Sequence, residues 1–369
     1  MPENKPASNN HIAKQLAKQI SAQGPISILE YMRIANEAYY DSRDPFGSDG
    51  DFITAPEISQ MFGEMIGLWM ADIWIQKGTP SNINYVELGP GRGTLASDIL
   101  RSGEKFGFKP APFFVEKSDT LRKAQSEAIA NANFCSSVDE LPDDGPLFIV
   151  ANEFFDALPI KQFISTHSGW RERVLTRDKG NKFIAMPGTS DVGGFIPNDI
   201  RSAPVDTIFE TCPEASNIIY ELVSKIKNQG GMLLVIDYGY DKLGHGSTLQ
   251  ALSNHKFADP FENPGERDLS AHVNFMEMAN IGRIRDMQIG GPVNQGNWLE
   301  YLGLNIRAEK LMASSPERSE EINNARKRLV DEDEMGRLFK VLCLAHIDWP
   351  LGEGFANKGT KIDLDESLI

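Results

Sequence analysis

Cysteine and histidine are scarce in this sequence, with three and six residues among 369. The three cysteines, Cys135, Cys212 and Cys343, lie far apart and form no CxxC pair. They therefore exclude a disulfide scaffold and a structural zinc site, and they are typical of a protein from a reducing compartment. Because no spacing of His and Asp residues matches a metal-ligand set, we expect no metal site.

Long apolar runs are also missing. A membrane-spanning helix needs roughly 18 consecutive apolar residues, whereas the longest candidate, 65–75, is short and carries Asp72. We therefore expect no membrane insertion. Segment 1–20 contains neither an apolar signal-peptide core nor an arginine-rich amphipathic pattern. This predicts a cytoplasmic protein if the chain is bacterial, with the mitochondrial matrix as the alternative.

Positive charge is in the minority, because 52 acidic residues face 37 basic ones and leave a net charge of −15. Such a chain repels phosphate backbones and anionic lipids, so we expect no nucleic-acid partner, whereas a cationic partner would be attracted. Apolar residues make up 41% and charged residues 24% of the sequence. This composition is typical of a globular protein, and the length allows one large domain or two.

Strand and helix patterns alternate through the middle of the chain. Short apolar segments predict strands, and helical patterns lie between them; the strand segments are Asn84–Leu88, Pro112–Val115, Asn133–Cys135, Leu147–Ala151, Met232–Asp237 and Leu338–Ala345. This alternation predicts an α/β fold with a doubly wound parallel sheet. Helical spacing also appears before the first strand, from His11 onwards. No regular element is predicted between 240 and 281.

A glycine-rich loop directly follows the first strand of this pattern. Alternating glycines allow a tight turn and a close approach to a ligand, and the next helix begins there. The loop and its flanks are Glu87, Leu88, Gly89, Pro90, Gly91, Arg92, Gly93 and Thr94. Its G-x-G-x-G spacing differs from the G-x-G-x-x-G fingerprint of dinucleotide-binding folds, which disfavours an NAD-dependent oxidoreductase. A purely structural turn is the other alternative.

Two acidic residues at the ends of neighbouring strands indicate which ligand the loop binds. Glu87 lies two positions before the first glycine, where it would suit the ammonium group of S-adenosylmethionine and repel a pyrophosphate. Glu116 ends the next strand and could accept both ribose hydroxyls of a nucleoside. We therefore predict S-adenosylmethionine as the cofactor, although Glu116 could instead cap the following helix.

The segment before the long apolar helix has the pattern of a capping box. Thr54 and Glu57 have the spacing of this motif, and Pro56 lies in the first turn, so we expect the helix through Met61 and Ile75 to begin here. The loop upstream, which includes Asp51, is longer than an ordinary connection and is a candidate functional segment.

Five ordered segments resemble the MidA-like family of class I S-adenosylmethionine-dependent methyltransferases, which includes the mitochondrial complex I assembly factor. They are GDFITAPEISQMFGEMIGLW (50–69), VELGPGRGTLASDIL (86–100), ANEFFDALPIKQF (151–163), GGMLLVIDYGY (230–240) and DLSAHVNF (268–275). The resemblance implies a Rossmann-like methyltransferase sheet, methylation of protein arginine, and a subunit of respiratory NADH dehydrogenase as the target. It also implies that Asp51, Thr54, Pro56 and Glu57 cover the cofactor. The sequence departs from relatives at Ser253-Asn254, His272 and Asn274, in the presumed lid.

Carboxylates after the fourth strand are the candidates for catalysis. An arginine substrate arrives charged, so carboxylates must orient its guanidinium. Asn152, Glu153 and Asp156 follow a strand at the edge where parallel sheets bind their ligands. Glu153 and Asp156 are predicted to clamp the guanidinium, with helix capping as the alternative. His255 is a further candidate for a substrate role, as is His272; either could be a structural hydrogen-bonding residue instead.

These observations divide the chain into six parts. We expect a disordered start, an N-terminal helical region, an S-adenosylmethionine-binding core with a hairpin insertion at about 160–200, a lid or substrate insertion, a C-terminal completion of the core and a flexible tail: 1–10, 11–80, 81–239, 240–285, 286–348 and 349–369. Two other functions remain open, namely an assembly chaperone that mainly binds a partner and a small-molecule methyltransferase. A homodimer is also left open.

Overall fold

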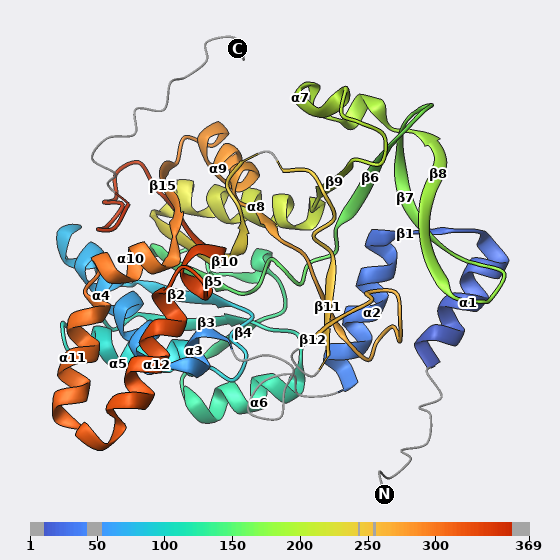
Figure 1. Cartoon of the computed structure of the whole chain (residues 1–369). Helices are drawn as coiled ribbons and strands as arrows, with labels where there is room; N and C mark the ends of the chain where they lie inside the picture. The colour runs from blue at the N-terminus through green and yellow to red at the C-terminus, as the bar shows by residue number, and fades with distance from the viewer. Residues whose placement is uncertain (1–10, 43–53, 243, 254–255, 356–369) are drawn as a thin grey trace, which may run out of the picture.

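A sheet of eight strands, seven of which follow one another along a continuous path, forms the centre of the described part of the molecule (Figure 1). The computed structural model describes residues 11–42, 54–242, 244–253 and 256–355. The strand order is β15-β16-β10-β5-β2-β3-β4. The bounds of these strands are β2 Asn84–Leu88, β3 Ala111–Val115, β4 Asn133–Cys135, β5 Leu147–Asn152, β10 Gly231–Tyr240, β15 Gln288–Asn294 and β16 Phe339–Ala345.

Strand directions confirm the predicted parallel sheet for five strands but not for the last predicted strand, β16. β4, β3, β2, β5 and β10 run parallel to one another, whereas β16 is antiparallel to both of its neighbours, β10 and β15. β16 therefore enters the sheet from the opposite end, between two strands that precede it in the sequence. Because β2, β5 and β10 all end at the same edge, the segments that follow them lie close together there.

Helices cover both faces of this sheet, so it is doubly wound as predicted. Successive residues of β10 belong to opposite cores: Leu234 packs on one face and Val235 on the other. The first face is covered by α4 Gln60–Gln76, α5 Thr94–Glu104, α10 Gln295–Tyr301, α11 Leu304–Ser314 and α12 Ser319–Val330. The second face is covered by α8 Pro213–Gln229 and α9 Phe275–Ile284.

A second, antiparallel sheet packs against the N-terminal helices at one side of the core (Figure 1). Its order is β1-β7-β6-β9, with β8 on β7. The strands are β1 Ile26–Ser27, β6 Lys161–Thr166, β7 Gly169–Arg177, β8 Phe183–Asp191 and β9 Ile208–Thr211, and the helices are α1 His11–Gln23 and α2 Ile28–Ser42. The predicted hairpin is therefore confirmed as β6–β7, within a larger sheet that includes β1 and β9.

No regular element is predicted for residues 240–281, but their described part contains four short strands and most of a helix. β11 Gln250–Ser253, β12 Lys256–Ala258 and β13 Asp268–Ser270 form a small antiparallel sheet, and β14 Val273–Asn274 extends the main sheet beside β10. Strands of two to four residues are too short to display an alternating pattern, which explains why the sequence does not predict them.

The predicted capping box is wrong. The Thr54 side chain makes no capping hydrogen bond, and the helix that follows it, α3 Ala55–Ile58, has only four residues. The long helix α4 begins separately, with Ser59 accepting a hydrogen bond from the Met61 N–H. The remaining helices are α6 Asp119–Ala128, α7 Asn198–Arg201, α13 Met335–Leu338 and the 3₁₀ turns Val138–Glu140, Gly193–Phe195 and Pro316–Arg318.

Glu64 joins three helices on the first face of the sheet. Its carboxylate on α4 is 4% exposed and lies 2.7 Å from Arg307 Nε on α11 and 3.2 Å from Arg101 Nη1 on α5. Burial acts to raise the pKa of Glu64, but the hydrogen bonds from Arg307 and Arg101 outweigh it, and the pKa is lowered. The ionised carboxylate is thus the stable form in this position.

Replacing this carboxylate should destabilise the fold in a pH-dependent way. We expect Glu64→Gln to lower the free energy of unfolding at pH 7 by about 1–3 kcal/mol, because both arginines remain partly exposed and can be rehydrated. The stabilisation is complete above the ordinary glutamate pKa of about 4.3 and is lost as pH falls through the lowered folded-state pKa. In calorimetry, the unfolding midpoints of Glu64→Gln and of the wild-type protein should therefore differ at pH 7 and converge as the pH is lowered.

Glu309→Gln provides the matched control, because Glu309 is exposed on the same helix as Arg307. This variant should unfold like the wild-type protein at both pH values. A midpoint for Glu64→Gln that equals the wild-type midpoint at pH 7 would contradict the stabilising role of the cluster.

Candidate active site beside the glycine loop

The glycine loop has the backbone shape that its sequence predicts. Gly89, Gly91 and Gly93 have φ angles of 60°, 54° and 82°, which lie in the left-handed region that side chains disfavour. At Gly89 a Cβ atom would also lie 3.0 Å from Phe154 Cδ2, closer than such atoms normally approach. The loop therefore needs glycine both for its turn and for its contact with the segment after β5.

A cavity with about 400 Å³ of empty space lies against this loop. It is lined by residues from three separate segments, all of which meet at the carboxyl edge of the sheet. The predicted site residues among them are Thr54, Pro56, Glu57, Glu87, Gly89, Pro90, Gly91, Thr94, Asn152 and Glu153. Arg92 and Leu95 also line the cavity.

Glu87 is a buried carboxylate in the wall of the cavity. It is 3% exposed, and the Tyr85 hydroxyl donates to its Oε2 atom at 2.6 Å. Burial raises the pKa of Glu87 to about 7, against the opposing effect of the Tyr85 hydrogen bond. A cationic group of a ligand would favour the ionised form, so this end of the cavity suits an ammonium group.

Glu116 directly follows β3 and does not line the cavity. Its Oε1 atom accepts a hydrogen bond from the Ser118 N–H at 2.8 Å, at the start of α6. Its Oε2 atom lies 3.3 Å from Gln125 Nε2. The residue that caps α6 is Ser118, whose hydroxyl accepts from the Leu121 N–H, and Glu116 holds the backbone of this cap residue. The ribose contact of Glu116 remains a prediction.

Gln125 links Glu116 to the glycine loop, and the sequence gives no sign of this role. The side chain is fully buried, and its Nε2 atom donates to the Gly91 carbonyl at 2.8 Å as well as to Glu116. Its Oε1 atom is buried without a hydrogen-bond partner among the described residues. A lone glutamine in a polar helix carries no pattern, so only the fold reveals the contact.

The short helix α3 is attached to two other walls of the cavity. The Ala55 N–H donates to Glu153 Oε1 at 2.9 Å, and the Thr94 hydroxyl donates to Glu57 Oε1 at 2.7 Å. Glu57 thus holds the start of α5 instead of completing a capping box. Asp51, which is predicted to act with this segment, lies outside the described residues, as does His255.

Asn152 and Glu153 bring acceptor atoms to the cavity from the end of β5. Glu153 has a φ angle of 49° and its N–H donates to the Ile236 carbonyl of β10 at 2.9 Å. Burial raises the pKa of Glu153 to about 7, the Ala55 N–H opposes this, and the charge of Asp156 adds to it. Asn152 Oδ1 is buried and has no hydrogen-bond partner within the described part of the chain. Both residues line the cavity, and each has an oxygen to which none of the described residues donates.

Asp156 lies near Glu153 but not on the cavity surface. It is 8% exposed, and burial raises its pKa to about 6 while a hydrogen bond from Tyr238 opposes the shift. Asp237 is fully buried behind it and accepts from the N–H groups of Phe155 and Asp156 at 3.0 and 3.3 Å. Burial, with the charge of Asp156, raises the pKa of Asp237 well above its usual range. Asp156, which is predicted to clamp the guanidinium together with Glu153, is therefore not among the residues that line this cavity.

Other expectations concern metals, membranes and histidine. No group of three or more His, Cys, Asp or Glu side chains suited to a metal ion occurs in the described ranges. Among the same residues, none of the helices has the length and apolar character required to cross a membrane. His272 lines a different cavity, and burial lowers its pKa.

Breaking the contacts of Gln125 should weaken cofactor binding without unfolding the chain. Gln125→Met keeps the length of the side chain but leaves the Gly91 carbonyl and Glu116 without their donor. We expect the affinity for S-adenosylhomocysteine to fall about tenfold, the effect of one or two lost hydrogen bonds. Titration calorimetry measures this directly.

Gln229→Met is the control, since Gln229 Nε2 also donates to a backbone carbonyl, that of Pro142, at 3.1 Å, away from the glycine loop. It should bind S-adenosylhomocysteine like the wild-type protein. Equal affinities in the two variants would show that the loop does not depend on Gln125.

The chain resembles mitochondrial proteins named as protein arginine methyltransferases along most of its length. "Protein arginine methyltransferase NDUFAF7 homolog, mitochondrial" of Drosophila melanogaster is 34% identical over 396 residues, which cover 93% of this chain and 88% of the relative. "Protein arginine methyltransferase NDUFAF7, mitochondrial" of Homo sapiens is 32% identical over 382 residues, covering 92% and 85%.

A solved structure supports the same fold. A crystal structure of a Burkholderia thailandensis protein bound to S-adenosyl-homocysteine superposes with a TM-score of 0.79 over 96% of each chain, at 23% identity. In addition, residues 65–293 match the family described as "Putative S-adenosyl-L-methionine-dependent methyltransferase". The fold, the family match and the relatives agree with the resemblance found in the sequence. The chain therefore belongs to the MidA-like family of S-adenosylmethionine-dependent methyltransferases.

Proposed function

We propose that this methyltransferase acts on an arginine side chain of a protein substrate, and that this substrate is a subunit of respiratory NADH dehydrogenase. The relatives at 32–34% identity carry the name protein arginine methyltransferase, which supports the first part. The target subunit rests on the family resemblance. Those relatives are also named as mitochondrial, which supports the mitochondrial matrix as the compartment over the bacterial cytoplasm.

The cavity beside the glycine loop fits the cofactor. Gly89 leaves room where a side chain would meet Phe154, and Glu87 offers a buried carboxylate to the ammonium group. When bound, S-adenosylmethionine supplies a methyl group on a positively charged sulfur. The cofactor would be held by Glu87, by the backbone of Gly89 and Gly91, and by Thr94. The proposal also assigns cofactor binding to Glu116 and Gly93, which do not line the cavity.

Glu153 and Asn152 are the residues that would receive the guanidinium. Glu153 Oε1 is held by the Ala55 N–H, whereas its Oε2 atom makes no hydrogen bond within the described part of the chain. The free oxygens of Glu153 and Asn152 could therefore accept N–H groups of the arginine and turn one nitrogen toward the methyl group. This pair of acceptors on the cavity wall is the observation that carries the proposal.

Methyl transfer requires the substrate to lose a proton. A carbon–nitrogen bond forms, the carbon–sulfur bond breaks with its electrons remaining on sulfur, and the nitrogen releases one proton. Glu153 could take this proton on Oε2, because its pKa is raised to about 7 by burial and by Asp156. Asp156 would act through Glu153 as a positioning residue, since it does not line the cavity.

The pH profile should report Glu153. The ionised carboxylate binds the guanidinium, so kcat/KM at saturating S-adenosylmethionine should rise with pH through about 7. Glu153→Gln should lower kcat by about 10²–10⁴-fold and remove this limb. Asp156→Asn should shift the limb to lower pH, because it removes a negative charge that raises the pKa of Glu153. An unchanged limb in Glu153→Gln would rule out this role.

The protein target can be tested in the host organism. In a strain that lacks this chain, mass spectrometry of the NADH dehydrogenase subunits should reveal an arginine without its methyl groups. The wild-type chain should restore the modification, and the Glu153→Gln variant should not. Recovery of enzyme assembly with Glu153→Gln, in the absence of methylation, would instead support the assembly chaperone. Unaltered subunits in the deletion strain would contradict the proposed target.

A further inference from the structure

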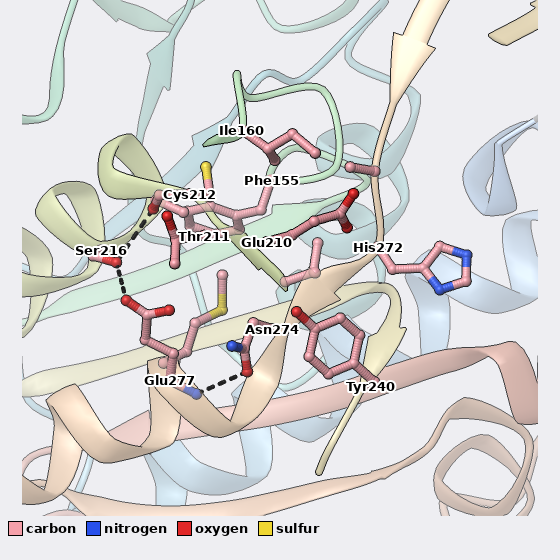
Figure 2. Close-up of a pocket in the computed structure, with 14 residues that line it drawn as sticks. Phe155, Ile160, Glu210, Thr211, Cys212, Ser216, Tyr240, His272, Asn274 and Glu277 are labelled. Atoms are coloured by element: carbon pink, nitrogen blue, oxygen red, sulfur yellow. Dashed lines mark hydrogen bonds between the residues drawn. The ribbon is translucent and has the colours of Figure 1, made fainter. Parts of the chain in front are cut away.

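A second cavity lies on the other side of the segment that follows β5. It is formed by α8, α9, β9 and the ends of β10 and β14, and the free space between its walls, part of it open to solvent, is about 430 Å³ (Figure 2). It shares no lining residue with the cavity beside the glycine loop. Phe154 contacts Gly89, Phe155 lines the second cavity, and their rings lie 5.2 Å apart. Two aromatic rings therefore separate the cavities.

The walls of this cavity suit a long side chain with a charged end. Phe155, Ile160, Ala215 and Met278 supply apolar surface. The polar groups are acidic or neutral, since none of the 14 lining residues is lysine or arginine, whereas Glu210 and Glu277 are both present. An anionic ligand would be repelled, and a wholly apolar one would leave the carboxylates without a partner.

Glu210 is already satisfied by the protein. Its Oε1 atom accepts from Gln162 Nε2 at 2.6 Å and from the Thr248 N–H at 3.0 Å, and its Oε2 atom accepts from the Thr248 hydroxyl. Arg173 lies behind it, with Nη1 2.8 Å from Gln162 Oε1. Glu210 therefore makes the cavity polar but has its own counter-charge nearby.

Glu277 is the carboxylate that remains for a ligand. Its Oε1 atom accepts from the Ser216 hydroxyl at 2.5 Å, which fixes its direction. Within the described residues its Oε2 atom makes no hydrogen bond, and the side chain forms no ion pair. The Tyr240 hydroxyl points inward in Figure 2 and makes no hydrogen bond to any described residue. Glu277 and Tyr240 thus offer two acceptor oxygens to one cation.

We propose that this cavity binds a second basic side chain of the protein substrate, beside the arginine that receives the methyl group. This inference rests on the proposed function. The acceptor arginine itself must reach the first cavity, from which the two phenylalanine rings separate this site. An arginine or lysine would place its apolar stem along Phe155 and Met278 and its cationic head between Glu277 and Tyr240.

The inference can be tested with n-butylguanidinium as the probe. Full-length protein labelled with ¹³C in its methionine methyl groups is titrated in the presence of S-adenosylhomocysteine. Met278 lines the cavity, and Met278→Leu assigns its signal. We expect a saturable shift of this signal, with a dissociation constant about tenfold higher in Glu277→Gln, because the amide keeps the contact with Ser216 but has no charge.

Two controls give the result its meaning. Glu221→Gln removes the same charge from an exposed position on α8 and should bind the probe like the wild-type protein. n-Pentanol has a similar stem without a charge and should bind at least about tenfold more weakly. The inference is overturned if the Met278 signal does not shift, if Glu277→Gln binds as tightly as wild type, or if n-pentanol matches the cation.

Calorimetry with S-adenosylhomocysteine on the same samples separates the two proposals. Normal binding of S-adenosylhomocysteine together with equal probe affinity in Glu277→Gln contradicts only the second basic side chain. Absence of S-adenosylhomocysteine binding to the folded wild-type protein contradicts the proposed function itself. Binding of S-adenosylhomocysteine should be the same in Glu277→Gln and wild type, because Glu277 does not line the first cavity.

Discussion

The arrangement of both cavities depends on how the end of β10 holds the turn after β5. Asp237 is fully buried and accepts hydrogen bonds from the N–H groups of Phe155 and Asp156, while the Ile236 carbonyl accepts from the Glu153 N–H. These contacts keep Glu153 in a left-handed backbone conformation that its side chain alone would disfavour. The turn can then direct Glu153 into one cavity and Phe155 into the other.

The same turn concentrates negative charge where a cation is expected. Burial raises the pKa values of Glu153, Asp156 and Asp237, and the charge of Asp156 adds to the shift at Glu153 and Asp237. The positive charge of Arg328 acts to lower the pKa of Glu153, but its effect is smaller than those of burial and of Asp156. A cationic substrate would relieve the repulsion, whereas a neutral one would leave it in place. The cluster therefore favours a guanidinium over a neutral small molecule, and the net charge of −15 acts in the same direction over longer distances.

Local patterns predict the sheet and the glycine loop, because alternating strands, helices and left-handed glycines leave clear marks in the sequence. β2 and β4 have the predicted bounds, and most of the predicted loop residues line one cavity. Contacts between distant segments leave no such mark. Glu57 has the sequence spacing of a capping residue, but in the structure it accepts a hydrogen bond from Thr94. Gln125 belongs to no sequence motif, so its contact with Gly91 cannot be predicted from the sequence. Asp156 has the predicted position in the chain, but the hydrogen bonds of Asp237 turn its segment away from the cavity surface.

The separation of the cavities also assigns different tasks to different parts of the chain. The glycine loop, Asn152 and Glu153 belong to the core sheet and its immediate connections, whereas Glu210 lies on β9 of the second sheet, and Thr248, which holds Glu210, precedes β11. Because no residue lines both cavities, the second could change its preference for a partner without moving the groups around the first. Phe154 and Phe155 connect the two sites, because Phe154 lies beside Gly89 of the first cavity, Phe155 lines the second, and their rings lie 5.2 Å apart. This pair therefore provides a direct structural route for coupling between partner binding and methyl transfer.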